Sequence, residues 1–476
     1  MANITFNAEL NSTCSIYIIN KLEDLPTDLL NEKESGFVRS KLKKNFEYAS
    51  LNRYDSGLVV LKAEDDNSYQ NKEKVRKLGA KITDLINSTK SQVIEIKDLS
   101  KGENFAIPLA EGMTLANYQF LKYFKDAKKK KNGLSKINIV SKTIDAQKIE
   151  ELIAGVEANA WAKDLVNEPL SFLTATELAN QIVEKTTPVG VKVEVLDQMK
   201  IETLKMGGLL AVNKGSLDPA TFTILEWKPE NARNEKPIVL VGKGIVYDTG
   251  GLSLKPTGNS MDFMKSDMGG AAAMVGAIYA TAKAKIPVHV IGLIPATDNR
   301  PSGNAYAPGD VVKMFNGLNV EVLNTDAEGR MVLADALSYA KKYDPELVID
   351  AATLTGAAVA ALGGEASAIM GTASESTMTD LKTAGTNTYE RVVEFPFFDE
   401  YDEYIKSDIA DLKNIGGPKA GTITAGKFLE HFTDFPWIHT DIAPTAWTIA
   451  SKGYISKGAT ASGVRLFFDF LINYKA

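Results

Sequence analysis

The sequence predicts an α/β protein built from two domains, a smaller N-terminal one and a larger C-terminal one. A chain of 476 residues is long for a single hydrophobic core, which favours two domains. Runs rich in β-branched and apolar residues alternate with segments of helical spacing, the order expected of helices packed on a sheet. A long helical pattern from Ala146 to Leu165 divides the chain and ends before Pro169, because the residue preceding a proline disfavours helix. We therefore expect an N-terminal α/β domain over 1–145, an interdomain helix over 146–168 and a C-terminal domain over 169–476.

The N-terminal domain is expected to hold at least four strands and two helices. The apolar runs that predict strands are Ser15–Asn20, Gly57–Ala63, Gln92–Ile96 and Lys136–Val140. Helical spacing marks Asn71–Asn87 and Leu115–Ala127. The lysine run Lys128–Lys131 then stands where a helix would end, with Gly133 as its cap, because positive charge suits the C-terminal end of the helix dipole. A nucleic-acid patch is the alternative, which the short run without interleaved aromatic residues disfavours.

The C-terminal domain is expected to contain a mixed, mostly parallel sheet flanked by helices. A helix at Ala175–Glu184 and a strand at Val191–Leu196 come first, and Pro237–Val241 is a continuous apolar run typical of a strand buried on both faces. Helices and strands then alternate, with helices at Met268–Lys285 and Arg330–Lys342 and strands at Pro287–Pro295, Asn319–Thr325 and Glu346–Asp350. In such sheets the loops at the carboxyl ends of the strands form the binding site.

Composition limits the class of protein and the kind of metal site. Lysine and arginine total 54 against 60 aspartate and glutamate, and the net charge of −6 disfavours binding to nucleic acid or to an anionic membrane surface. The chain has one cysteine, Cys14, and three histidines, His289, His431 and His439, so a zinc site of four cysteines, or of two cysteines and two histidines, is excluded. The ligands of any metal should therefore be mostly carboxylates. A single thiol, an N-terminus without a secretory pattern and no apolar run of ~20 residues favour a cytoplasmic protein without a membrane span.

The first candidate motif is the glycine-rich segment Gly242–Gly251, which places Lys243 and Asp248 after a buried strand. Two phosphate-binding patterns fail here on spacing. A Walker A loop needs serine or threonine after the lysine, where this chain has Gly244, and a dinucleotide fingerprint needs a third glycine, where it has Tyr247.

Three further motifs carry charged groups whose usual roles are structural. Taken alone, Lys255 is a solvated loop lysine and Asp267 is an N-cap of the alanine-rich helix that follows it. Asp326 and Glu328 are two residues apart, which in an extended segment puts both carboxylates on one face. Their structural alternative is a charged turn with Arg330 as counter-ion, or acidic residues that favour the first turn of the next helix.

Together these motifs would bring four carboxylates to one end of one sheet, namely Asp248, Asp267, Asp326 and Glu328. Divalent metal would make such a cluster tolerable, because buried charges need compensation. Two metals ~3.5–4 Å apart that share carboxylates match the charge and suit hydrolysis. A lysine beside two cations should have a lowered pKa, so a neutral lysine amine could ligate metal, and a charged lysine slightly farther away could polarise a carbonyl.

The stretch Gly242–Leu337 resembles the catalytic core of the leucyl aminopeptidases, the two-metal cytosolic aminopeptidase family. The most specific motif is Asn-Thr-Asp-Ala-Glu-Gly-Arg at 324–330. Other segments similar to the family extend the likeness from about Asp164 to Arg465; they are 164–169, 350–356, 407–414 and 437–443. The resemblance implies a macro-like N-terminal domain and a homohexamer. It also implies a metal-dependent aminopeptidase that releases N-terminal residues, leucine and other apolar ones favoured, from peptides with a free N-terminus.

Carried over position by position, the resemblance implies two metal subsites. Lys243, Asp248, Asp267 and Glu328 would hold one ion, and Asp248, Asp326 with its backbone carbonyl and Glu328 would hold the second, more exchangeable one. Zinc is the expected metal, and manganese, magnesium or cobalt would also suit the exchangeable subsite. No histidine is required for this chemistry.

The resemblance also implies roles for residues around the metals. Lys255 would polarise the scissile carbonyl while a metal-bridging hydroxide attacks it, and Arg330 would hold a bicarbonate that serves as general base. The substrate-binding residues would be Met264, Asn324, Thr353, Leu354 and Ala443, with Thr353 and Leu354 offering backbone contacts.

Two departures from the family pattern lie near the expected pocket. They bear on which N-terminal residue of the substrate is preferred and leave the metal chemistry intact. Pro444 stands where the family commonly has glycine, and the stretch 256–261 is one residue longer than usual. Two alternative functions stay open at this point: a Cys-Gly-type dipeptidase of the same fold, and a DNA-binding regulator with a residual peptidase fold.

Overall fold

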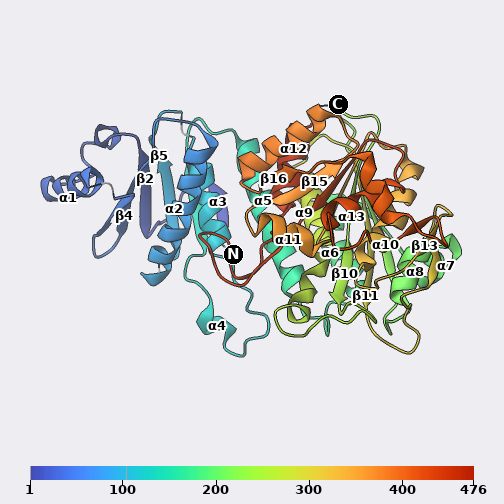
Figure 1. Cartoon of the computed structure of the whole chain (residues 1–476). Helices are drawn as coiled ribbons and strands as arrows, with labels where there is room; N and C mark the ends of the chain where they lie inside the picture. The colour runs from blue at the N-terminus through green and yellow to red at the C-terminus, as the bar shows by residue number, and fades with distance from the viewer. Residues whose placement is uncertain (1, 45, 90, 103, 476) are drawn as a thin grey trace. The chain divides into compact units, whose positions relative to one another are not determined.

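The computed structural model describes residues 2–44, 46–89, 91–102 and 104–475, and these fall into two compact units (Figure 1). The first unit contains the chain up to Ala160 together with Ala450–Lys457. The second contains Trp161–Ile449 together with the chain from Gly458 onward. Helix α5, Ala146–Asn167, therefore begins in the first unit and ends in the second.

The first unit is organised by a six-stranded sheet with the order β1-β6-β5-β2-β4-β3. All neighbours pair in parallel except β3 and β4. The strands are β1 Asn3–Phe6, β2 Cys14–Ile19, β3 Tyr48–Asn52, β4 Gly57–Lys62, β5 Val93–Asp98 and β6 Lys136–Val140. Its helices are α1 Glu32–Lys43, α2 Tyr69–Ser88, α3 Ala106–Ala116 and the short α4 Ala127–Lys130.

Glycines let α2 and α3 pack closely on this sheet. A Cβ atom on Gly112 would lie 2.0 Å from the carbonyl oxygen of Arg76, and one on Gly79 would lie 2.7 Å from that of Leu109. Buried aliphatic residues of both helices and of β2, β5 and β6 form one hydrophobic core. This contact explains why α2 and α3 can share one face of the sheet.

The helix expected at Leu115–Ala127 is wrong, because α3 ends at Ala116 and an irregular segment follows. Side-chain hydrogen bonds hold that segment. Asn117 Nδ2 donates to the carbonyl of Leu134, and Gln119 Nε2 donates to that of Lys130. Such local bonds compete with helix formation. The lysine run forms the short helix α4, whose C-cap is Lys131 in extended conformation rather than Gly133. The sequence did not predict strands β1 and β3 or helix α1.

The second unit contains a nine-stranded mixed sheet. Its path is β16-β15-β18-β14-β9-β11-β8-β7, and β10 pairs with β11. The strands are β7 Lys192–Leu196, β8 Thr221–Trp227, β9 Ile238–Gly242, β10 Gly244–Asp248, β11 Val290–Asn299, β14 Leu347–Ala352, β15 Ser367–Gly371, β16 Val392–Glu394 and β18 Trp437–Asp441. The central strands β11, β9, β14 and β18 are parallel, so their carboxyl ends meet at one edge of the sheet.

Helices and two small sheets complete the second unit. The helices are α6 Ala175–Thr186, α7 Gln198–Leu204, α8 Gly207–Asn213, α9 Gly269–Lys283, α10 Glu328–Ala340, α11 Gly356–Leu362, α12 Glu375–Thr388, α13 Gly421–Glu430 and α14 Val464–Asn473. One small sheet joins β12 Val311–Lys313, β13 Asn319–Glu321 and β17 Leu412–Lys413, and the other pairs β19 Trp447–Thr448 with β20 Gly458–Ala459. Within the described residues, no helix has both the length and the apolar character to cross a membrane.

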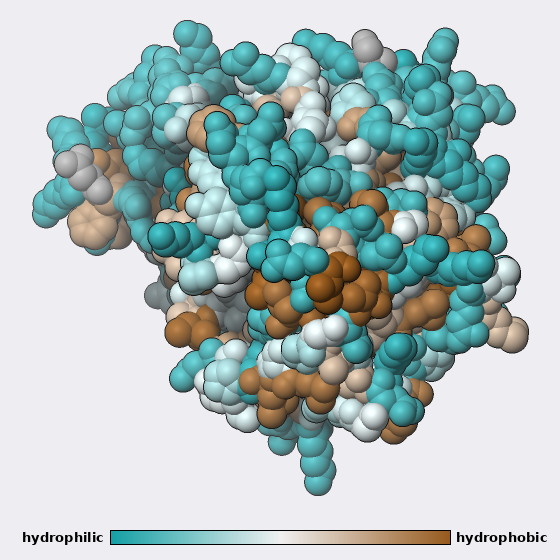
Figure 2. All heavy atoms as spheres, turned by 45° about the vertical axis from the view of Figure 1, so that its right-hand side comes forward, coloured by the Kyte–Doolittle hydropathy of each residue, from teal (hydrophilic) through white to brown (hydrophobic). Residues whose placement is uncertain are grey.

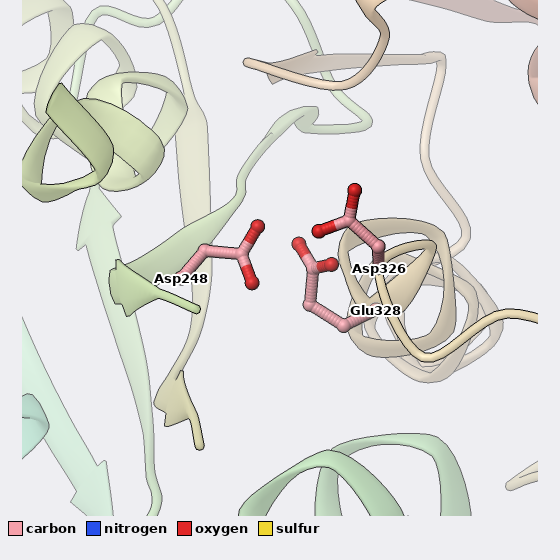
Figure 3. Close-up of side chains that lie close together, drawn as sticks. All are labelled: Asp248, Asp326 and Glu328. Atoms are coloured by element: carbon pink, nitrogen blue, oxygen red, sulfur yellow. The ribbon is translucent and has the colours of Figure 1, made fainter. Parts of the chain in front are cut away.

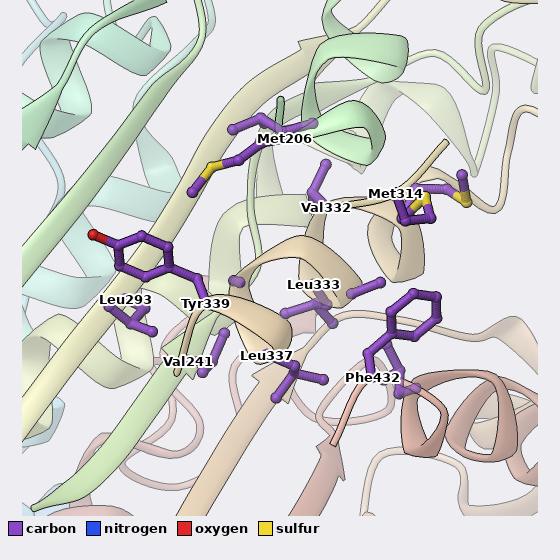
Figure 4. Packing of buried hydrophobic residues seen from close by; sticks show 14 of the residues in the cluster. Met206, Val241, Leu293, Met314, Val332, Leu333, Leu337, Tyr339 and Phe432 are labelled. Atoms are coloured by element: carbon purple, nitrogen blue, oxygen red, sulfur yellow. The ribbon is translucent and has the colours of Figure 1, made fainter. Parts of the chain in front are cut away.

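The core of the second unit holds α10 against the central strands. Val332, Leu333 and Leu337 of α10 pack among Val241 of β9 and Leu293 of β11 (Figure 4). Helix α9 also packs on β9 and β14. This approach needs Gly270, where a Cβ atom would lie 2.0 Å from the carbonyl oxygen of Ala351. Packing thus carries the first turns of both helices to the carboxyl edge of the sheet.

The strand expected at Asn319–Thr325 is shorter than predicted and lies elsewhere. Strand β13 ends at Glu321 and belongs to the small sheet with β12 and β17. The residues after it turn instead of extending, because the side chain of Asn414 binds this backbone. Its Oδ1 accepts from the amide of Leu323, and its Nδ2 donates to the carbonyl of Asn324.

Candidate functional site

Three carboxylates from two segments of the chain converge at the carboxyl edge of the main sheet. Asp248 ends β10, Asp326 lies in the turn before α10, and Glu328 is the first residue of α10. Figure 3 shows their side chains directed toward one another, and one oxygen from each lies within 4.8 Å of the others. Asp248 and Glu328 are buried, and Asp326 is partly exposed. Asp326 and Glu328 therefore share a site through a turn and not through the extended segment expected for them.

Asp267 and Lys243 adjoin this cluster. Lys243 follows β9, and its Nζ lies 2.8 Å from Asp267 Oδ1 and 2.9 Å from Glu328 Oε1. Nζ also donates to the carbonyl oxygen of Thr353 at 2.9 Å. Asp267 does not cap α9, since Met268 holds the N-cap position. Its carboxylate accepts from Lys243 and from the hydroxyl of Thr353 instead.

Lys255 approaches the cluster from the loop after β10. Its Nζ lies 2.9 Å from Asp248 Oδ2 and 2.5 Å from Asp326 Oδ1. The loop can turn back sharply because Gly250 and Gly251 have φ angles of 85° and 63°, a region that glycine adopts without strain. A Cβ atom on Gly250 would also lie 2.8 Å from Asp326 Oδ1, so glycine is needed there for space as well.

The buried charges shift one another's pKa values. Burial and the neighbouring Glu328 raise the pKa of Asp248 to about 7, and burial raises that of Asp267 well above its usual range. Burial also acts to raise the pKa of Glu328, but Lys243 and Lys255 outweigh it and the value is lowered. Burial acts to lower the pKa of Lys243, yet Asp267, Glu328 and Asp248 outweigh it and raise the value. The lowered lysine pKa expected from sequence therefore depends on cations that offset these carboxylates.

The donor set fits divalent cations. Asp267 Oδ2 and Glu328 Oε2 are buried without a hydrogen-bond partner among the described residues. Two lysines also cannot neutralise four carboxylates, and buried charge without compensation is costly. Hard oxygen ligands with one nitrogen suit zinc, manganese or magnesium. The arrangement can therefore hold metal at the centre of these four side chains.

Arg330 lies two residues after Glu328 on α10 but forms no ion pair with the acids of the cluster. Its Nη1 donates to the carbonyl oxygen of Asn414 at 2.8 Å, and its Nε is buried without a partner in the described part of the chain. Burial lowers its pKa to about 10. The alternative of Arg330 as counter-ion in a charged turn is therefore wrong, and the guanidinium keeps a donor for an anion.

Of the five expected substrate-binding residues, Asn324 and Thr353 bond members of the acidic cluster. Asn324 accepts from the amide of Asp326 at 2.8 Å and so shapes the turn itself. The amides of Leu354 and Ala443 both donate to Asp441 Oδ1 at 3.1 Å, so the Leu354 amide is already engaged. Thr353 is half-buried and bonds Asp267, and Met264 is half-buried in the 3₁₀ helix Met261–Met268.

Several residues that hold the site were not expected from sequence. Asn299 donates to both Asp248 and the Thr325 carbonyl, and Tyr306 donates to the same carbonyl. Asp441 accepts from two amides and from the hydroxyl of Thr355. Asn299 ends β11, Asp441 ends β18 and Tyr306 lies in the loop between β11 and β12, so only the tertiary structure brings them to the site. The three histidines bond Glu226, Asp402 and Asp350, outside the cluster.

A family profile and curated relatives match the part of the chain that contains this site. The sequence profile of the cytosol aminopeptidase family, catalytic domain, matches residues 160–468. A probable cytosol aminopeptidase of Geobacter sulfurreducens is 46% identical over 76% of this chain and 74% of its own length. One from Chlorobaculum tepidum is 52% identical over 65% of this chain and 61% of its own length.

Solved structures are similar over nearly the whole chain. A tomato leucine aminopeptidase carrying a point substitution superposes with a TM-score of 0.85 and 26% identity, covering all of this chain and 97% of that one. The bottromycin maturation enzyme BotP, in complex with Mn, superposes with a TM-score of 0.84 and 27% identity, covering 97% of this chain and 99% of that one.

Proposed function

The chain belongs to the cytosol aminopeptidase family, and from that premise we propose that its acidic cluster is a two-metal centre that removes N-terminal residues from peptides. One observation carries this proposal: the carboxylates of Asp248, Asp326 and Glu328 share a space within 4.8 Å of one another. Family membership makes the chain a metal-dependent aminopeptidase.

The contacts support two subsites that share two carboxylates. Lys243 contacts both Asp267 and Glu328, and these three residues with Asp248 would hold the tighter ion. Asp326 lies at the more exposed end and would hold the second ion with Asp248 and Glu328. Greater exposure at Asp326, whose side chain is 31% exposed, favours exchange of that ion. We propose zinc for the tight subsite and zinc, manganese, magnesium or cobalt for the other.

The chain's own residues would then orient the peptide and manage charge. Bound metals would supply a water of lowered pKa and polarise the scissile carbonyl. Lys255, released from Asp248 and Asp326 by those cations, would direct its ammonium at the developing oxyanion. Arg330 would hold bicarbonate through its unpartnered Nε, and the bicarbonate would serve as general base. A free α-amine of the substrate would bind one of the metals, which would explain a requirement for an unblocked N-terminus.

Residues around Thr353 would select the side chain of the N-terminal residue of the substrate. Met264, Thr353 and Ala443 would line the pocket, while Asn324 and the carbonyl of Leu354 would bind the backbone of the peptide. The hydroxyl of Thr353 donates to Asp267, so a hydrogen bond links this wall of the pocket to a proposed metal ligand. Apolar first residues, leucine among them, are the expected preference.

We further propose a cytoplasmic homohexamer. The relatives are named cytosol aminopeptidases. Apolar side chains gather on one face in Figure 2, and the exposed leucines of the second unit include Leu252 and Leu254 at 47% and 60%. Exposed apolar patches commonly mark assembly surfaces. Sedimentation of the purified chain tests the hexamer directly.

Glu328→Ala tests the proposed activity. It removes the carboxylate shared by both subsites, so we expect loss of leucine p-nitroanilide hydrolysis with an unchanged circular dichroism spectrum. The control is Glu365→Ala, an exposed glutamate whose contact with Arg391 lies on the surface. Near-normal turnover by Glu328→Ala contradicts the proposal. A comparison of the kinetics on Leu-Gly and Cys-Gly separates a broad aminopeptidase from a Cys-Gly dipeptidase. Neither the site nor the comparisons favour the DNA-binding alternative.

A further inference from the structure

We propose that Asn299 is a positioning residue that orients Asp248 for metal binding and joins the two segments that carry the metal ligands. The proposal rests on the two-metal centre described above. The neutral side chain of Asn299 would touch neither metal nor substrate, yet its loss would weaken metal binding.

Asn299 lies where two strands bring it against Asp248. It is the last residue of β11, it pairs in register with Asp248 of β10, and it is fully buried. Its Nδ2 donates to Asp248 Oδ1 at 2.8 Å and to the carbonyl oxygen of Thr325 at 2.9 Å. Thr325 immediately precedes Asp326, so one amide group links both ligand-bearing segments.

These bonds decide which oxygen Asp248 can offer. Its Oδ1 accepts from Asn299 and also from the amide of Gly250 at 2.8 Å. An oxygen with two such donors has both lone pairs engaged. Oδ2 is left facing the cluster, where it lies 2.9 Å from Lys255 Nζ. Asn299 thus fixes the carboxylate with a single oxygen directed at the other ligands.

The hydrogen-bonding balance of Asn299 supports a role beyond packing. Because its NH₂ group must face the two acceptors, its Oδ1 is left buried without a partner among the described residues. An unpaired buried acceptor costs about 1–3 kcal/mol. Positions where a buried polar atom is left without a hydrogen-bond partner are commonly functional. The outer partners of metal ligands are a known case, and their loss weakens metal binding about 10–100-fold.

Tyr306 offers a matched control. Its hydroxyl donates to the same Thr325 carbonyl at 3.0 Å, and it is also buried, but it has no hydrogen bond to Asp248. Tyr306→Phe therefore weakens the support of the Thr325 turn while leaving the Asn299–Asp248 bond in place. A purely structural role of Asn299 predicts similar effects for both substitutions.

The test measures binding of Zn²⁺ and Mn²⁺ alone by metal-stripped, full-length protein in competition with a chelator. We expect Asn299→Ala to raise the dissociation constant of both ions about 10–100-fold and Tyr306→Phe to raise it less than about 3-fold. The metal-induced increase in melting temperature should shrink in Asn299→Ala only. Asn299→Ser is measured beside it, so that a folded variant exists if the alanine variant does not fold, and weaker binding is expected there too.

Two outcomes overturn the inference. The first is an unchanged metal affinity in folded Asn299→Ala or Asn299→Ser. The second is an equal loss of metal affinity in Tyr306→Phe, which would assign the effect to the Thr325 turn. Failure of the two-metal proposal is distinguishable, because the wild-type protein itself would then not bind two ions.

Discussion

Gly329 supports Lys243 by having no side chain. A Cβ atom at Gly329 would lie 2.6 Å from both Cε and Nζ of Lys243. Nζ has little freedom to move, since it contacts Asp267, Glu328 and the Thr353 carbonyl within 2.9 Å. The first turn of α10 and the end of β9 therefore meet at the site only because glycine follows Glu328.

Gly329→Ala should reduce kcat/KM for leucine p-nitroanilide about 100-fold, because displacement of a catalytic group by about 1 Å can cost this much. Gly303→Ala is the control, since a Cβ there would have no atom within 4 Å. Wild-type kinetics in Gly329→Ala would show that Lys243 can move aside without consequence.

Asp441 should control the substrate pocket through the backbone. Asp441→Ala leaves the amides of Leu354 and Ala443 without their acceptor, and each buried unpaired donor costs about 1–3 kcal/mol. We expect a lower melting temperature and a KM raised more than kcat is reduced. Asp441→Asn retains Oδ1 and should keep near-normal KM, and equal effects of the two substitutions would argue against the backbone role.

Arg330→Met should abolish activation by bicarbonate. The wild-type rate is expected to rise when bicarbonate is added to a carbonate-free buffer, because a positioned proton acceptor contributes about 10²–10⁴-fold. The variant should start low and not respond. Arg300→Met, at an arginine whose side chain is 42% exposed, should respond like the wild type, and a bicarbonate response in Arg330→Met would remove this residue from the proposed role.

His439 should make stability depend on pH. It is fully buried with Nδ1 2.7 Å from Asp350 Oδ1. Burial acts to lower the pKa of His439, but Asp350 outweighs it and the pKa is raised. The pair therefore contributes stability that is complete below about pH 6.5, the unfolded value, and that is lost as pH rises through the raised folded pKa.

The measurement compares unfolding of the wild type and His439→Gln between about pH 6 and pH 9. The stability advantage of the wild type should shrink as pH rises. An advantage that stays constant with pH would mean that His439 keeps one protonation state throughout.

Local sequence predicted much of the fold where packing and propensity agree. Pro237–Val241 and Ala146–Leu165 correspond closely to β9 and α5, because a continuous apolar run suits a strand buried on both faces and a long periodic pattern suits a helix. The prediction of a helix at Leu115–Ala127 failed because the side chains of Asn117 and Gln119 donate hydrogen bonds to backbone carbonyls. Spacing could not show that these side chains have acceptors within reach.

The residues of the candidate site were found from sequence because charge is conspicuous. Asp248, Asp267, Asp326 and Glu328 stand next to apolar runs, where buried acids need a partner. Asn299 and Tyr306 carry no charge and match no motif, so nothing in their neighbourhood marked them. Their roles depend on which carbonyl and carboxylate the sheet brings within hydrogen-bond distance.

The sequence by itself predicted that four carboxylates and two lysines, without cysteine or histidine ligands, would carry the chemistry, because side-chain type and local pattern can be read from the chain. Only the tertiary structure decided that Asp326 reaches Glu328 through a turn, that Gly329 makes room for Lys243, and that Asn299 aims Asp248. Those relationships join residues from β9, β10, β11 and α10, and distances between separate elements follow from packing of the whole core, which no local pattern encodes.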